Sequence, residues 1–190
     1  MLAPHSSHLI LGGARSGKSR RAQELAHRWE RVAVVATAEA LDDDMAARIA
    51  RHRAERPSGW VTVESPLDPV GACRLLAGSV DVAVVDCLTL WVSNRLLRGD
   101  DAEAILGGAA ALAALCRERA LSLVIVSNEV GEGVHPETRE GLRFRDLLGL
   151  VNQRVAEAAD RVTLMVAGIP LAVKDDMPGL RLAPDAGATA

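Results

Sequence analysis

Eight residues near the start of the chain constrain its fold more than any other segment. They match the pattern Gly-x4-Gly-Lys-Ser, follow an apolar run at 7–11 and precede a segment at 18–29 with apolar residues at helical spacing. In this strand-loop-helix context the pattern predicts a P-loop, whose backbone N–H groups wrap phosphates, with Lys18 on the β and γ oxygens and the Ser19 hydroxyl free for Mg²⁺. The loop comprises Gly12, Gly13, Ala14, Arg15, Ser16, Gly17, Lys18 and Ser19.

The rest of the chain alternates between short apolar runs and longer helical patterns. Continuous apolar runs between helices predict an α/β fold of the P-loop NTPase type, with a mostly parallel sheet covered by helices on both faces. With 190 residues in total, we expect one nucleotide-binding domain over 1–176 and a loose tail, rich in Pro, Gly and Ala, over 177–190. Strands are expected at 7–11, 32–36, 60–64, 82–86, 123–126, 162–166 and 170–174, and helices at 18–29, 42–56, 67–77, 88–97, 102–120 and 144–159.

Composition excludes several classes of protein. A net charge of -3 and 2% aromatic residues provide neither a cationic field nor stacking platforms for nucleic acid. Three cysteines without a paired motif disfavour a disulfide framework and a zinc site. No apolar run approaches the length of a membrane span, and the first residues lack a signal-peptide pattern. We therefore expect a cytoplasmic protein with no membrane insertion and no nucleic-acid partner.

The run Val82–Asp86 has the form of the second half of a nucleotide site. It is an apolar strand that ends in a carboxylate, which can hold Mg²⁺ beside the P-loop. We expect Mg²⁺ bound with ATP or GTP, and Ser19 and Asp86 as its protein-side contacts. The Asn-Lys-x-Asp signature of regulatory GTPases and the HRD and DFG motifs of protein kinases are missing from the sequence. The motifs leave a small-molecule kinase, another nucleotide-hydrolysing enzyme or an ATP-gated binding module.

Two further features lie outside these motifs. His52 follows Met45 and Ile49 at helical spacing, so spacing alone favours a half-buried core histidine over a catalytic one. The segment 127–131 directly follows a buried strand, at the edge where open α/β sheets bind ligands, and is where we expect a substrate contact.

A cluster of arginines comes next in the chain. Arg139, Arg143 and Arg145 can recognise a phosphate or pair locally with acids, and local pairing is the favoured interpretation. The acids within reach in the sequence are Glu137, Glu140 and Asp146.

Taken together, the ordered segments over residues 8–174 resemble one family, the bifunctional adenosylcobinamide kinase and adenosylcobinamide-phosphate guanylyltransferases of cobalamin biosynthesis. Several blocks in a fixed order are far more specific than a P-loop alone. They are residues 12–19, 36–38, 43–49 with His52 and Arg56-Pro57, 60–64, 86–89, 127–131 and 143–146 with Asn152-Gln153.

The resemblance implies two reactions in one protein. The first phosphorylates the aminopropanol hydroxyl of adenosylcobinamide, and the second transfers GMP from GTP to the new phosphate, releasing pyrophosphate, through a guanylylated histidine that corresponds to His52. Either one pocket then serves two attack geometries or the helix with His52 moves. The family likeness also implies a homotrimer and a corrinoid substrate. The residues it places around the nucleotide are Thr37, Ala38, Glu39, Glu55, Arg56, Pro57, Glu64 and Asp86.

One segment departs from the family pattern, at 133–136, where His135 precedes the proline and becomes a second histidine near the expected site. A role in loop hydrogen bonding is favoured for it over proton transfer. Two alternatives to the bifunctional enzyme stay open: a monofunctional P-loop kinase for another small alcohol, and a nucleotide-gated binding module without chemistry on a second substrate.

Overall fold

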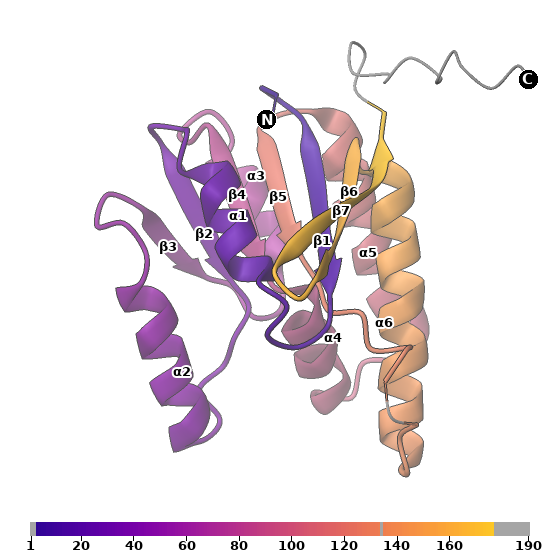
Figure 1. The fold of residues 1–190 in the computed structure, drawn as a ribbon. Coiled ribbons are helices and arrows are strands. Elements are labelled where there is room, and N and C mark those ends of the chain that lie inside the picture. The colour runs from indigo at the N-terminus through magenta and orange to yellow at the C-terminus, as the bar shows by residue number, and fades with distance from the viewer. Residues whose placement is uncertain (1–2, 134, 177–190) are drawn as a thin grey trace, which may run out of the picture.

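A computed structural model describes residues 3–133 and 135–176 of the chain. The expected tail at 177–190 lies outside the described residues. The elements follow the predicted alternation of strands and helices (Figure 1). In chain order they are β1 (Ser7–Gly12), α1 (Lys18–Ala26), β2 (Val32–Ala36), α2 (Asp43–Ala54), β3 (Val61–Glu64), α3 (Pro69–Leu76), β4 (Val82–Asp86), α4 (Leu88–Leu97), α5 (Ala102–Glu118), β5 (Ser122–Val126), α6 (Arg139–Ala158), β6 (Arg161–Val166) and β7 (Ile169–Asp175).

The strands form a seven-stranded sheet in the order β3-β2-β4-β5-β1-β6-β7. Every pairing is parallel except that of β7, which runs antiparallel to β6. The prediction of a mostly parallel α/β sheet is therefore confirmed. Asp86 at the end of β4 is in register with Ala36 of β2 and Val126 of β5, so the carboxyl ends of the central strands meet at one edge.

The continuous apolar runs have a simple physical origin, since helices cover both faces of the sheet (Figure 1). In β4, Val82 and Val84 pack into the core on the face covered by α1, whereas Ala83 and Val85 pack into the larger core on the face covered by α3, α4, α5 and α6. Successive side chains of a strand point to opposite faces, so a strand buried on both faces needs apolar residues throughout.

Two predicted helix boundaries are wrong by three residues or more, and the others differ by at most two. The first helix ends at Ala26 rather than at 29, and α6 begins at Arg139, five residues before the predicted 144. Thr138 explains the early start of α6, because its hydroxyl accepts a hydrogen bond from the N–H of Gly141 at 3.0 Å and caps the first turn. Among the described residues, we find no helix with both the length and the apolar character required to cross a membrane.

Candidate active site

The loop between β1 and α1 has the backbone geometry that phosphate binding requires. Gly12 has a φ of 148°, and a Cβ at this position would lie 2.6 Å from the carbonyl oxygen of Met165. Gly17 has a φ of 96° and precedes α1 without a side-chain cap. The first N–H groups of α1 therefore have no competing side-chain acceptor at the cap, and together with the helix dipole they can bind an anion.

Two side chains of this loop are buried in a way that suits a phosphate. Lys18 is only 8% exposed, and its Nζ donates to the carbonyl of Gly13 at 2.6 Å. Burial lowers the pKa of Lys18, while the neighbouring Cys87 and Asp86 oppose that shift. The Ser16 hydroxyl is buried and has no hydrogen-bond partner among the described residues. The unpaired Ser16 hydroxyl and the buried Lys18 ammonium can both donate hydrogen bonds to phosphate oxygens.

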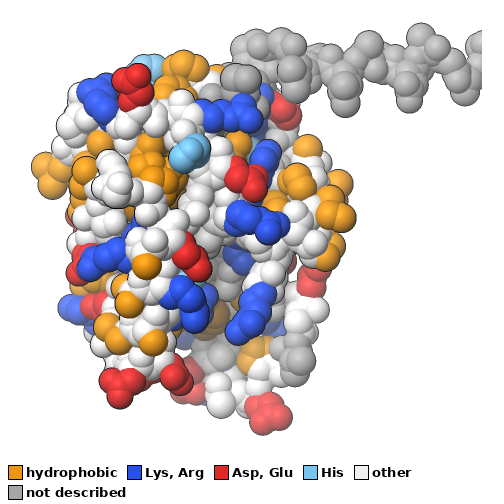
Figure 2. Space-filling model, turned by 60° about the vertical axis from the view of Figure 1, so that its left-hand side comes forward, with side chains coloured by type: hydrophobic (Ala, Val, Ile, Leu, Met, Phe, Trp, Pro, Cys, Tyr) orange, Lys and Arg blue, Asp and Glu red, His pale blue; other side chains and the backbone are white. Residues whose placement is uncertain are grey.

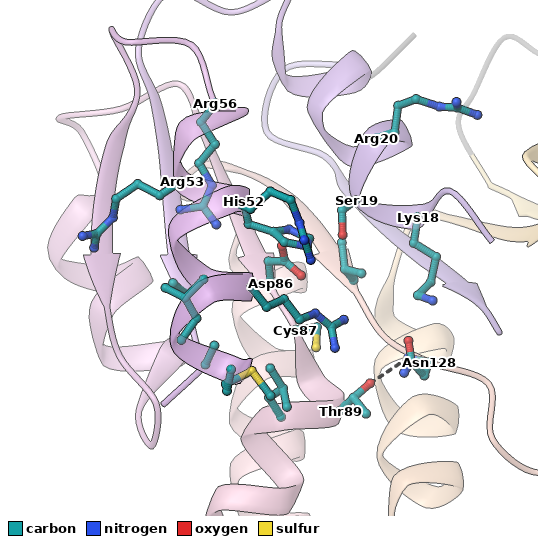
Figure 3. Close-up of a pocket in the computed structure, with 18 of the residues that line it drawn as sticks. Lys18, Ser19, Arg20, His52, Arg53, Arg56, Asp86, Cys87, Thr89 and Asn128 are labelled. Carbon is teal, nitrogen blue, oxygen red and sulfur yellow. Dashed lines mark hydrogen bonds between the residues drawn. The ribbon is translucent and has the colours of Figure 1, made fainter. Parts of the chain in front are cut away.

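The loop opens into a cleft of about 660 Å³ between the carboxyl edge of the sheet and α2. Figure 3 shows that the side chains around it come from the start of α1, from the ends of β4 and β5, and from α2. Basic side chains gather around a hollow on one face of the molecule (Figure 2). Of the expected site residues, those that line the cleft are Ala14, Arg15, Ser16, Gly17, Lys18, Ser19, Ala38, His52, Arg56, Glu64 and Asp86.

Asp86 lies at the bottom of this cleft, among positive charges. Burial raises its pKa, and the charges of His52, Arg56 and Arg48 oppose that shift. The Ser19 hydroxyl and the Asp86 carboxylate line the same cleft and offer the oxygen ligands that Mg²⁺ prefers. No group of three or more His, Cys, Asp or Glu side chains that could hold a metal occurs in the described part of the chain. The two oxygens thus fit a Mg²⁺ ion shared with nucleotide phosphates and water.

His52 lies on the side of α2 that faces the cleft, close to Asp86 (Figure 3). It is half-buried, as its spacing indicated, but the cleft rather than either apolar core surrounds it. No residue of α2 is buried, and the helix is held by its own cap at Asp42 and by contacts to β3. Arg53 on α2 pairs with Glu64 of β3 at 2.5 Å, and Arg56 donates to the Thr62 hydroxyl at 3.2 Å.

Several expected nucleotide contacts lie elsewhere. Thr37 is buried, and its hydroxyl accepts from the N–H of Cys87 at 2.8 Å and donates to the Cys87 carbonyl at 2.7 Å, which ties β2 to β4. Glu39 pairs with Arg98 at 2.9 Å. Glu55 and Pro57 line a second hollow beside α1. The loop glycines Gly12 and Gly13 shape the backbone but do not line the cleft. The expected contacts that do not line the cleft are therefore Gly12, Gly13, Thr37, Glu39, Glu55 and Pro57.

The arginine cluster after β5 lies away from the cleft. Arg145 pairs with Asp146 at 2.9 Å and donates to His135 Nδ1 at 2.9 Å, so the predicted local pairing is confirmed for this residue. Arg143 donates to the carbonyl of Asp100 at 3.2 Å. His135 is exposed and takes part in loop hydrogen bonding.

Among the cleft residues to which sequence reasoning assigned no role are Arg48, Arg51 and Thr89. Arg48 could have been found, because it precedes His52 by four residues and shares its helix face. Thr89 lies in the block 86–89 that contributes to the family resemblance, but its residue type alone indicates no chemical role. Asn128, within the segment where we expected a substrate contact, does line the cleft.

The sheet, the loop and the cleft define a P-loop nucleotide-binding protein. The family model described as "Cobinamide kinase / cobinamide phosphate guanyltransferase" matches residues 8–173, and the chain belongs to this family, as the resemblance predicted. The chain is 44% identical over 169 residues to a bifunctional adenosylcobalamin biosynthesis protein CobP of Pseudomonas aeruginosa, covering 88% of this chain and 97% of that protein. It is 40% identical over 180 residues to a bifunctional adenosylcobalamin biosynthesis protein CobU of Escherichia coli, covering 87% and 98%. The corresponding CobU of Salmonella typhimurium is 41% identical, with the same coverage.

Proposed function

We propose that this protein phosphorylates adenosylcobinamide with ATP or GTP and then transfers GMP from GTP to the product, giving adenosylcobinamide-GDP and pyrophosphate in cobalamin biosynthesis. Membership of the family supports both activities. The observation that carries the proposal is that His52, a nucleophile, lines the same cleft as the phosphate-binding Lys18. A single triphosphate held there can be attacked at two different phosphorus atoms.

In the kinase step, the substrate hydroxyl attacks the γ-phosphorus and the β–γ bridge breaks. The backbone N–H groups at the start of α1 and the Lys18 ammonium hold the phosphates and stabilise the charge that builds up on them. Mg²⁺, held by Ser19 and Asp86, would neutralise phosphate charge. We expect Ala14 to Gly17 to wrap the phosphates and Arg56 and Glu64 to contact the nucleotide.

In the second step, a neutral ring nitrogen of His52 attacks the α-phosphorus of GTP and pyrophosphate leaves from the P-loop. The phosphate monoester of the corrinoid then attacks the same phosphorus and releases His52. Arg48 and Arg56 are the cations that can stabilise charge on the α-phosphate, because they line the cleft on the same side as His52. Arg48 is one helical turn from His52, which couples its position to that of the nucleophile.

We propose a cytoplasmic homotrimer that takes a nucleotide and a corrinoid as its ligands and does not bind nucleic acid. The modest net charge of -3 supports the last point, since no overall cationic field would attract a polyanion.

The test is covalent labelling with GTP radiolabelled at the α-phosphate. We expect acid-labile, base-stable label on the wild-type chain and none on His52→Ala, while phosphorylation of cobinamide by ATP persists in that variant. His135→Ala is the matched control, because this histidine is exposed and hydrogen-bonded to Arg145 outside the cleft, and it should label like wild type. Label that survives in His52→Ala contradicts the mechanism, and kinase activity without any label supports a monofunctional kinase.

A further inference from the structure

The segment that leaves β5 is held unusually firmly at the edge of the cleft. The N–H of Ser127 donates to the carbonyl of Ile10 at 3.0 Å, and the N–H of Glu129 donates to the carbonyl of Gly12 at 3.1 Å. Both acceptors belong to β1, the strand that feeds the P-loop. Residues 127–129 are therefore fixed relative to the phosphate-binding backbone.

Buried side chains fix Asn128 itself. Its N–H donates to the Thr89 hydroxyl at 2.8 Å, and its carbonyl accepts from Asn152 Nδ2 at 3.0 Å. Asn152 in turn accepts from the Ser127 hydroxyl at 2.7 Å. Ser127, Asn152 and Thr89 are 0%, 5% and 8% exposed. Polar groups that are buried this completely must all be paired, so the network permits a single backbone position for Asn128.

The side chain of Asn128 is the one part of the residue that this network does not use. Among the described residues, no hydrogen bond to its carboxamide is formed, and the group lines the cleft. A carboxamide offers a donor at Nδ2 and an acceptor at Oδ1, and it does not exchange protons near neutral pH. It can orient a hydroxyl and a phosphoryl oxygen together but cannot act as a base.

The position of Asn128 indicates which reaction it serves. Figure 3 shows Asn128 beside Lys18 and Thr89, and His52 on the other side of Ser19, beside Asp86. Lys18 of a P-loop contacts the β- and γ-phosphates. A triphosphate held by this loop therefore presents its γ end to Asn128, while His52 acts at the α-phosphorus.

We propose that Asn128 contacts the reacting groups of the kinase step, with Nδ2 donating to a γ-phosphoryl oxygen and Oδ1 accepting from the substrate hydroxyl. This inference rests on the proposed function. The hydroxyl oxygen forms a bond to the γ-phosphorus, the β–γ bridging bond breaks and the nucleoside diphosphate leaves. The hydroxyl proton passes to an oxygen of the transferred phosphoryl group and from there to water. Asn128 aligns the attack without taking that proton.

Phosphorylation of cobinamide and guanylylation of His52 can be measured separately, so a loss confined to one step can be detected. Asn128→Ala should lower the kcat for phosphorylation of cobinamide about 100-fold or more, the scale of losing an aligned donor near the reacting phosphate. Guanylylation of His52 by α-labelled GTP should stay within about threefold of wild type. Asn128→Asp keeps the size of the side chain but removes the donor and places a negative charge beside the γ-phosphate, so we expect at least as large a kinase loss.

Gln153→Ala is the matched control, because it removes an exposed amide from α6 and should leave both steps unchanged. Equal losses in the two steps of an Asn128 variant, or kinase activity within threefold of wild type, overturn the assignment of Asn128. A wild-type chain that does not phosphorylate cobinamide overturns the proposed function, and this inference falls with it. If Asn128→Ala does not fold, Asn128→Asp decides the question, because it keeps the size of the side chain.

Discussion

At the scale of single residues, His8 links the stability of the sheet to pH. It lies on β1, is 5% exposed, and its Nε2 is 2.8 Å from the Thr163 hydroxyl oxygen, while its Nδ1 has no partner among the described residues. Burial, together with the charges of Arg161 and Arg21, lowers the pKa of His8 to about 4. The folded state therefore keeps His8 neutral where the unfolded state takes up a proton.

This shift predicts a loss of stability as pH falls. Above the unfolded pKa of about 6.5 His8 is neutral in both states and has no effect. Between about 6.5 and 4 the unfolded chain alone is protonated, so the free energy of unfolding falls by about 2 kcal/mol by pH 5. Urea unfolding at pH 7 and pH 5 should show this loss in wild type and not in His8→Gln.

His27→Gln is the control for that measurement, since His27 is exposed at the end of α1. It should keep the pH dependence of wild type. Parallel pH profiles for His8→Gln and wild type would show that other groups cause the acid sensitivity.

At the scale of elements, α2 differs from the other helices near the site because none of its residues is buried. Its stability depends on local terms: the Asp42 carboxylate accepts from the N–H of Met45 at 2.6 Å, Asp43 and Asp44 lie in the first turn, and basic residues lie in the last. The helix that carries the proposed nucleophile is thus the one with the least support from the core.

Asp42→Ala should cost α2 about 1 kcal/mol, which corresponds to about fivefold faster amide hydrogen exchange in this helix, with the global unfolding free energy unchanged. Asp101→Ala removes the equivalent cap of α5, whose Asp101 carboxylate accepts from the N–H of Ala104 at 2.8 Å. Because α5 is packed into the core through residues such as Ile105 and Leu112, we expect that variant to lower global stability instead. Unchanged exchange in α2 would mean that contacts to β3 hold the helix.

The same contrast explains how much of the structure the sequence predicts. The strands can be predicted from the sequence, because burial on both faces requires a continuous apolar run such as Val82–Asp86. The start of α6 cannot be predicted in the same way, because it depends on the Thr138 cap and the first turn contains Gly141, which is typical of a loop. Periodicity cannot bring His52 to the cleft, since α2 buries nothing and its placement depends on the strand order. That assignment came from family resemblance.

At the scale of the whole molecule, the sheet places both proposed reaction centres at one edge. The order β2-β4-β5-β1 sets Asp86, Asn128 and the P-loop on three neighbouring strands, although they are far apart in the chain. Strand order is a property of long-range packing that local patterns do not encode, so neither the Thr89 to Asn128 hydrogen bond nor the location of Thr37 behind the cleft could be predicted from the sequence.

The edge strand β7, at one side of the sheet, is relevant to the proposed trimer. Val166, Ile169 and Leu171 of the β6–β7 hairpin are each more than half exposed, and the register pairs Val166 with Ile169. An apolar edge strand in water is a surface for association, because its unpaired backbone and its side chains both gain from a partner.

Sedimentation equilibrium should therefore give a mass near three times the 20.1 kDa of the chain. Combined Ile169→Lys and Leu171→Lys should shift the protein toward the monomer, because charged side chains resist desolvation in an interface. Leu75→Lys is the matched control: this leucine is 87% exposed on α3, away from the hairpin, and the substitution should leave the mass unchanged. A wild-type mass of a single chain contradicts the trimer itself. An intact trimer in the double variant shows instead that the interface lies elsewhere, because lysines at 169 and 171 of β7 could not be buried in an interface without leaving unpaired charge.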